Sequence, residues 1–169
     1  MKATILGVAT LVFAGCAVQP QTYTMQKSFD EALAKTMVMA GKNTIKGSAL
    51  VRQNGGGVVT CAGNEVIAIP VTQYADERMW LLYGSYQRGF RHVGMGGFVI
   101  TNENPAYRSL VLKTTCDAQG GFKFGNVADG SFYVATQVKW SVGTQPQGGA
   151  LMLKVNVWKG EEKEIVLSP

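Results

Sequence analysis

The sequence predicts a single, mainly β domain built as a β-sandwich of about seven short strands. Segments in which apolar and polar residues alternate recur along the chain, and turn-forming residues separate them, with 21 glycines in 169 residues. Hydrophobic residues make up 46% of the chain and charged residues 16%, so there is enough apolar surface to bury a modest core, which argues against disorder. Two segments depart from the alternation and predict an N-terminal helix and a helical insertion.

The first sixteen residues have the composition of a bacterial lipoprotein signal peptide. Residues 3–14 form an uncharged apolar run that is too short to span a bilayer, which needs about 20 residues, but that fits the apolar part of a secretory signal. The run ends in Phe13-Ala14-Gly15-Cys16, which resembles the lipobox of bacterial prolipoproteins, with Phe13 in the place of the usual leucine. The resemblance implies that residues 1–15 are removed and that Cys16 becomes the lipidated N-terminus.

The residues around this cleavage point leave one alternative and indicate a location. An ordinary secretory signal could instead be cut near Ala14 or Ala17, with Cys16 incidental. If Cys16 is lipidated, an alanine rather than an aspartate at position 17 favours the outer membrane of a Gram-negative cell. Residues 16–27 lack periodicity, so we expect a lipidated tether that connects the membrane to the domain.

Residues 28–43 lead into the domain, and residues 28–40 among them predict a helix. Ser28 is placed to cap its N-terminus, Glu31 follows three residues later as in a capping box, and Gly41 ends the helix. The apolar residues that share one helical face are Phe29, Leu33, Met37 and Ala40. We expect this face to pack on the edge of the domain, and a partner-binding helix is the alternative.

Residues 44–169 form the predicted sandwich. A strand at 45–53 and an extended segment at 58–60 flank a glycine-rich turn. Residues 65–72 predict another strand, with apolar residues on both faces. Pro70 indicates that this strand ends there or lies at a sheet edge.

Residues 74–97 interrupt the sandwich and carry a candidate binding surface. Residues 74–86 have helical period, and residues 84–97 contain five glycines, which predicts a flexible or tightly turning loop. Because insertions into the loops of a rigid scaffold often carry binding, we select four residues as the candidate surface: Trp80, Arg88, Arg91 and His92. The alternative is a helix that only covers one sheet.

The last third of the chain predicts five more strands. They span residues 110–115, 121–124, 131–140, 151–158 and 164–167, with turns at 116–121 and 126–130 and a loop around 145–149. Alternation places Phe122 and Phe124 together on the core face, and it gives the strand at 131–140 one apolar face: Phe132, Val134, Thr136, Val138 and Trp140. We expect the last two strands to pair with each other across Lys159-Gly160.

Residues 114–134 carry a family pattern. They read Thr-Thr-Cys-Asp-Ala-Gln-Gly-Gly-Phe-Lys-Phe, then Asn-Val-Ala-Asp-Gly-Ser-Phe-Tyr-Val after one intervening glycine. This resembles the carboxypeptidase regulatory-like domain at Asp117, Phe122, Phe124, Val127, Gly130 and Val134, while Phe132 takes the place of the family's tyrosine. The resemblance extends over about residues 44–167 apart from the insertion. It implies a transthyretin-like, immunoglobulin-like sandwich and brings no catalytic activity with it.

Cys61 and Cys116 are predicted to form a disulfide. The chain has three cysteines, and lipidation of Cys16 would leave these two as a pair in an oxidising compartment. The alternative is two buried, reduced cysteines that pack as small hydrophobic residues. Neither has a second cysteine or a histidine at zinc-ligand spacing, so we expect no metal site.

No catalytic or nucleic-acid motif accompanies these features. No serine lies in a nucleophile elbow, the glycines at 55–57 lack the lysine of a phosphate loop, and the carboxylates are scattered. His92 is the only histidine and is expected to be a surface or loop residue. The net charge is +5, and the basic residues do not cluster into a stripe. We therefore expect no nucleic-acid partner, no cofactor and no small-molecule substrate.

Two function classes remain. The first is a non-enzymatic cell-envelope lipoprotein, anchored to a membrane through its lipid, that acts as a structural or protein-binding module within a membrane-associated assembly. The second is a carbohydrate-binding module that uses exposed aromatic residues, for which Trp80, Trp140 and Trp158 are the candidates. Because a tryptophan on an apolar strand face more often belongs to the core, the sequence favours the first class.

Overall fold

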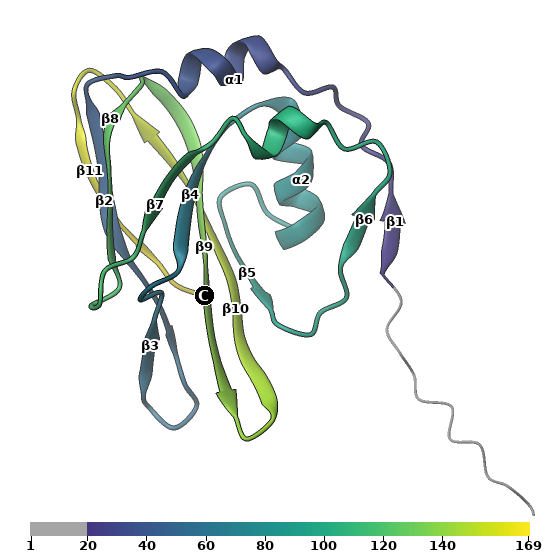
Figure 1. Cartoon of the computed structure of the whole chain (residues 1–169), viewed down its shortest axis with the longest axis vertical. Helices are drawn as coiled ribbons and strands as arrows, with labels where there is room; N and C mark the ends of the chain where they lie inside the picture. Colours follow the sequence, from purple (N-terminus) through teal and green to yellow (C-terminus); the bar gives the residue numbers. More distant parts are fainter. Residues whose placement is uncertain (1–19) are drawn as a thin grey trace, which may run out of the picture.

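The computed structural model describes residues 20–169 and confirms a mainly β sandwich with an N-terminal helix and a helical insertion (Figure 1). The expected signal peptide at 1–15, Cys16 and the first part of the expected tether lie outside the described residues. In the part of the chain that is described, no helix has the length and apolar character needed to cross a membrane.

Two sheets form the sandwich. One has five strands in the order β5 (Arg88–His92), β10 (Gln145–Val157), β9 (Gly130–Val142), β4 (Glu65–Pro70) and β7 (Leu112–Thr115). The other is built around β2 (Asn43–Arg52), which pairs with β11 (Glu162–Leu167) along one edge and with β8 (Gly121–Val127) and β3 (Val58–Thr60) along the other. The helices are α1 (Glu31–Met37), α2 (Gln73–Tyr83) and the short 3-10 helix η1 (Pro105–Arg108).

The main core lies between the two sheets. As the alternation predicts, β9 sends Phe132, Val134 and Val138 into it, and β8 contributes Phe122 and Phe124, which pack edge to face with their ring centroids 6.1 Å apart. All five side chains are buried. Since burying one such side chain contributes about 1.5–3 kcal/mol, this layer is a major source of the domain's stability.

A second core lies between the five-stranded sheet and α2. This explains why β4 is apolar on both faces: Val66 faces the other sheet, whereas Ile69 packs toward α2. Thr72 caps the start of α2, because its hydroxyl accepts a hydrogen bond from the Ala75 N–H at 3.1 Å. Gly84 ends the helix in the left-handed conformation, with a φ of 65°.

The N-terminal helix is shorter than the sequence predicts. Asp30, rather than Ser28, caps α1, since its carboxylate accepts a hydrogen bond from the Leu33 N–H at 2.9 Å. Only two turns follow, so the expected apolar face is not built. Met37 is buried, but Leu33 is exposed.

The hairpin of β9 and β10 is longer than expected, and the predicted loop at 145–149 is part of β10. The two strands pair without a break from Gln145 opposite Val142 to Val157 opposite Gly130. Position 148 requires a glycine, because a side chain there would collide with the backbone of β9 and with the Trp140 ring. The glycine that indicates a loop in the sequence therefore permits close strand packing.

The expected pairing of the last two strands is wrong. After β10 the chain turns at Lys159 and Gly160, which both have positive φ, and crosses to the other sheet. There β11 runs parallel to β2, from Glu162 opposite Thr44 to Leu167 opposite Ala49. The crossover therefore adds the last strand to the β2 sheet instead of extending the five-stranded sheet.

The predicted tether ends earlier than residue 27. β1 (Gln21–Tyr23) pairs in parallel with β6 (Phe98–Ile100), and the following residues are held by the carboxylate of Glu77. That carboxylate accepts hydrogen bonds from the Tyr23 hydroxyl at 2.9 Å and from the backbone N–H groups of Gln26 and Lys27 at 2.8 Å each. From Gln21 onward the N-terminal segment is therefore part of the folded domain.

The predicted disulfide between Cys61 and Cys116 is confirmed. Its Cα atoms are 5.8 Å apart and both cysteines are buried, one just after β3 and the other just after β7. It links the end of the β2–β3 hairpin to the edge of the five-stranded sheet, and so fastens the two sheets together.

Candidate functional site

The structure separates the four residues of the predicted binding surface. Trp80 lies on α2, with 54% of its surface exposed. Arg88, Arg91 and His92 do not belong to a flexible loop, because residues 88–92 form β5 at the edge of the five-stranded sheet. Along β5 the side chains alternate, so these residues point to different faces.

Arg91 has a structural role. Its guanidinium donates hydrogen bonds to the carbonyl oxygens of Leu82, at 3.0 Å, and of Gly96, and it lies over the Phe98 ring at 5.3 Å from the centroid. These contacts fasten the end of α2 to the segment after β5. The Arg88 side chain is exposed near the other end of the strand.

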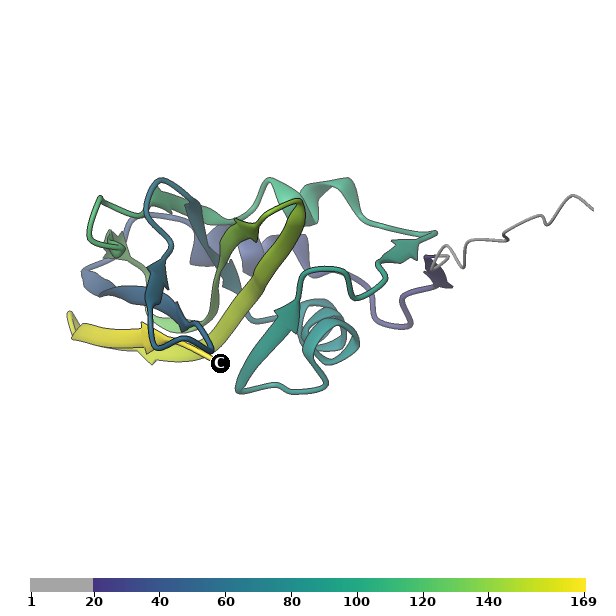
Figure 2. The ribbon, with the colours of Figure 1, turned by 90° about the horizontal axis from the view of Figure 1, so that it is seen from below.

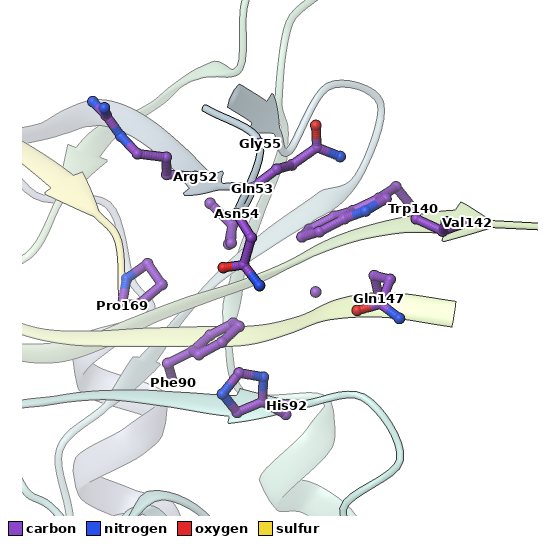
Figure 3. A pocket seen from close by; sticks show the side chains of 12 residues that line it. Arg52, Gln53, Asn54, Gly55, Phe90, His92, Trp140, Val142, Gln147 and Pro169 are labelled. Carbon is purple, nitrogen blue, oxygen red and sulfur yellow. The ribbon is translucent and has the colours of Figure 1, made fainter. Parts of the chain in front are cut away.

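His92 borders a pocket at one end of the sandwich, which we call the sandwich-end pocket (Figure 3). Its volume is about 540 Å³, and its lining residues come mainly from the β2–β3 turn, β5 and the β9–β10 hairpin. Figure 1 shows this turn and this hairpin projecting from the same end of the sandwich. The side chains that line it and that matter below are Asn54, Phe90, His92, Trp140 and Gln147.

Aromatic rings form one part of this pocket. Phe90 lies opposite Leu151 on β10 and therefore points to the inner face of the sheet. The His92 ring meets the Phe90 ring at 69°, with centroids 4.4 Å apart, and the half-buried Trp140 indole borders the other side (Figure 3). Gly148 lies beneath that indole, and its lack of a side chain leaves room for the ring.

Amide side chains form the polar part of the pocket. Asn54 comes from the β2–β3 turn and points into the space between Phe90 and Trp140, while the Arg52 guanidinium points away (Figure 3). Gln147 contributes a second amide from β10. No aspartate or glutamate is among the lining residues, and the amides offer neutral donors and acceptors beside the aromatic faces.

Sequence reasoning missed three of these residues. Asn54 lies in a segment predicted to be a turn, Gln147 in a predicted loop and Phe90 in the segment predicted to be a flexible or tightly turning loop. Trp140 is one of the three tryptophans named for a carbohydrate site, although the sequence favours a core position for it. The structure places it at the open end of the core, where it is only partly covered. Trp158 is 53% exposed near the β10–β11 crossover and lies outside this pocket.

The described residues contain no group of three or more histidine, cysteine, aspartate or glutamate side chains that could hold a metal ion. The pocket residues offer a ligand flat apolar faces, amide hydrogen-bond donors and acceptors, and one imidazole. Nucleophile and base pairs with hydrogen-bonding geometry are not among them.

Comparison with known proteins finds a likeness in structure. No family model and no curated protein matches the sequence. A crystal structure described as a "putative carbohydrate binding protein" from Pseudomonas aeruginosa superposes with a TM-score of 0.71 at 18% sequence identity. The match covers 85% of this chain and 99% of that chain. At this identity the likeness establishes a shared fold.

Proposed function

We propose that the protein is a non-enzymatic, carbohydrate-binding protein of the cell envelope and that sugars bind in the sandwich-end pocket. The observation that carries this proposal is the arrangement of Trp140 and Phe90 beside the Asn54 amide in one open pocket. The P. aeruginosa protein of the same fold supports it, since that protein is described as a "putative carbohydrate binding protein".

The chemistry of the pocket suits a sugar ring. Aromatic faces pack against the apolar C–H face of a pyranose and carry partial negative charge toward those hydrogens. Planar amides such as those of Asn54 and Gln147 can donate to one hydroxyl and accept from another at the same time. A small number of polar groups around apolar walls is the usual composition of a specific ligand pocket.

Replacing Trp140 with alanine is expected to weaken sugar binding by at least about tenfold, which corresponds to about 1.4 kcal/mol. The measurement is a glycan array on the wild-type protein, followed by calorimetry of both proteins with the best-binding glycan. Trp158→Ala is the matched control, because it removes an exposed tryptophan outside the pocket. Binding should persist in EDTA, because no carboxylate side chain lines the pocket.

The alternative class, a protein-docking module, predicts a different experimental result. A single stoichiometric protein partner captured from solubilised membranes, with no glycan signal on the array, would contradict the carbohydrate proposal. Equal losses of glycan binding in Trp140→Ala and Trp158→Ala would show that the pocket is not the site.

We also propose that the chain is anchored in the outer membrane through lipid on Cys16. The lipobox-like sequence supports this, and the disulfide fits an oxidising compartment. Bacteria fed an alkyne-labelled palmitate should incorporate the label into the wild-type chain. The Cys16→Ser variant should remain unlabelled and should no longer sediment with membranes. Equal labelling of both chains would overturn the proposal.

A further inference from the structure

A second hollow lies on the other face of the five-stranded sheet, beside α2. We propose that it is a second sugar-binding site, built on a platform of two stacked aromatic rings. This proposal rests on the proposed function, because it assigns the same class of ligand to a separate site. We call it the platform pocket. It has a volume of about 510 Å³, and its lining includes Gln73, Asp76, Glu77, Trp80, Tyr86 and Lys154.

The platform consists of Trp80 and Tyr86. Their rings are stacked at 24°, with centroids 5.1 Å apart, although 54% of Trp80 and 45% of Tyr86 are exposed. Gly84 makes this stack possible, since its left-handed conformation turns the chain back so that Tyr86 meets the last turn of α2. The stacked pair leaves an exposed outer ring face, held in a fixed arrangement, that packing against the core does not require.

Charged groups around the platform are held in place by the fold. Asp76 accepts a hydrogen bond from the Tyr133 hydroxyl at 2.5 Å, and the Lys154 ammonium lies 3.8 Å from the same carboxylate oxygen. The other oxygen of Asp76 has no hydrogen-bond partner among the described residues, and it can accept a sugar hydroxyl. Lys154 can donate, so the pair offers both functions at the edge of the platform.

Glu77 is a second carboxylate among the lining residues of this hollow, and hydrogen bonds hold it in place. Burial alone would raise its pKa, but hydrogen bonds from the backbone N–H groups of Gln26 and Lys27 and from Tyr23 outweigh it and hold the pKa below its usual range. The carboxylate therefore stays ionised at neutral pH. With two carboxylates and two lysines among its lining residues, the hollow has no net charge, which favours a neutral hydroxyl-rich ligand over an ionic one.

The two pockets lie on opposite faces of the same sheet. Phe90 and Trp140 belong to the face that packs against the β2–β11 layer, whereas Lys154 lies opposite Tyr133 on the face that α2 covers. Figure 2 shows α2 on the far side of β9 and β10 from β2 and β11. Each molecule can therefore hold two glycan segments at once, and the two sites should act independently.

Three tryptophans make the two sites separately observable. We would label the full chain with ¹⁵N-tryptophan in a zwitterionic, sugar-free detergent and record its three indole N–H signals during titrations. The probes are the methyl glycosides of glucose, galactose, mannose and N-acetylglucosamine. The Trp80 and Trp140 signals should shift with at least one shared probe and with different dissociation constants, while the Trp158 signal should stay fixed as an internal reference.

Variants distinguish failure of this inference from failure of the proposed function. Tyr86→Ala keeps the Trp80 reporter but removes its stacked partner, so it should weaken the platform response by at least tenfold. Trp80→Ala removes the platform reporter, and it should leave the affinity reported by Trp140 unchanged within twofold. A shift at Trp140 alone would overturn the second site and leave the proposed function standing. A shift at Trp80 alone would overturn the assignment of the sandwich-end pocket. If neither signal moves with any probe, both proposals fail.

Discussion

Replacing both Cys61 and Cys116 with alanine is expected to lower the free energy of unfolding by about 4 kcal/mol. The disulfide closes a loop across 55 residues, and for a loop of that length the chain-entropy treatment gives about 4 kcal/mol of unfolded-state restriction. Both cysteines are buried between the sheets, so the variant also loses packing there. Urea unfolding followed by tryptophan fluorescence measures the effect.

The reduced wild-type protein is the matched control for this variant. Reductant should destabilise the wild-type chain by a similar amount and should leave the double variant unchanged. Thiol-reactive mass tagging of the denatured, unreduced protein should leave both cysteines unlabelled. Labelling of both sulfurs without reduction would show that the disulfide is absent from the native protein.

The elements that the sequence predicted well are those whose signal is local. The strand at 131–140 alternates cleanly because one face meets the main core, and the helical period that predicted α2 lies within its own residues. One source of error in the predicted elements was the glycines. Gly89 suggests a loop, yet it sits inside β5 because the Tyr83 side chain of α2 occupies the place of its missing Cβ. A sequence shows the glycine but not the helix that needs it.

Partners that are distant in the sequence are the second source of error. The alternation of β11 is the same whether it pairs with β10 or with β2, so the sequence could not decide between them. The pocket was missed for the same reason. Asn54, Phe90 and Trp140 belong to three separate strands and turns, and only the packing of the two sheets brings them to one opening. One feature of the sequence could have indicated that Trp140 lies near the end of the core. The opposite face of β9 becomes polar and exposed from Gln137 onward, which marks the end of the covered part of the sheet.

The Asn43 side chain holds the crossover between the two sheets in place. Replacing Asn43 with alanine is expected to lower the free energy of unfolding by about 3 kcal/mol. The side chain is fully buried, and its Nδ2 group donates to the Val127 carbonyl at 3.0 Å and to Asp129 at 2.8 Å. Its Oδ1 accepts from the Gly160 and Glu161 N–H groups at 2.8 and 2.9 Å. Alanine removes all four bonds, and each buried group left without a partner costs about 1–3 kcal/mol, reduced where water can enter. Thermal unfolding by circular dichroism measures the loss.

The pH dependence tests whether these hydrogen bonds, rather than volume, carry the stability. The Asn43 amide and the Lys159 N–H hold the pKa of Asp129 below its usual range, so this contribution is present above the unfolded pKa and is lost as the pH falls through the folded pKa. Asn43→Ala should therefore lose less stability than the wild type between about pH 5 and pH 2, the titration range of an aspartate. Asn156→Ala, which removes an exposed asparagine from β10, should change stability by less than about 0.5 kcal/mol and keep the wild-type pH profile. A profile for Asn43→Ala that parallels the wild type would mean that the side chain fills space at the crossover without anchoring Asp129.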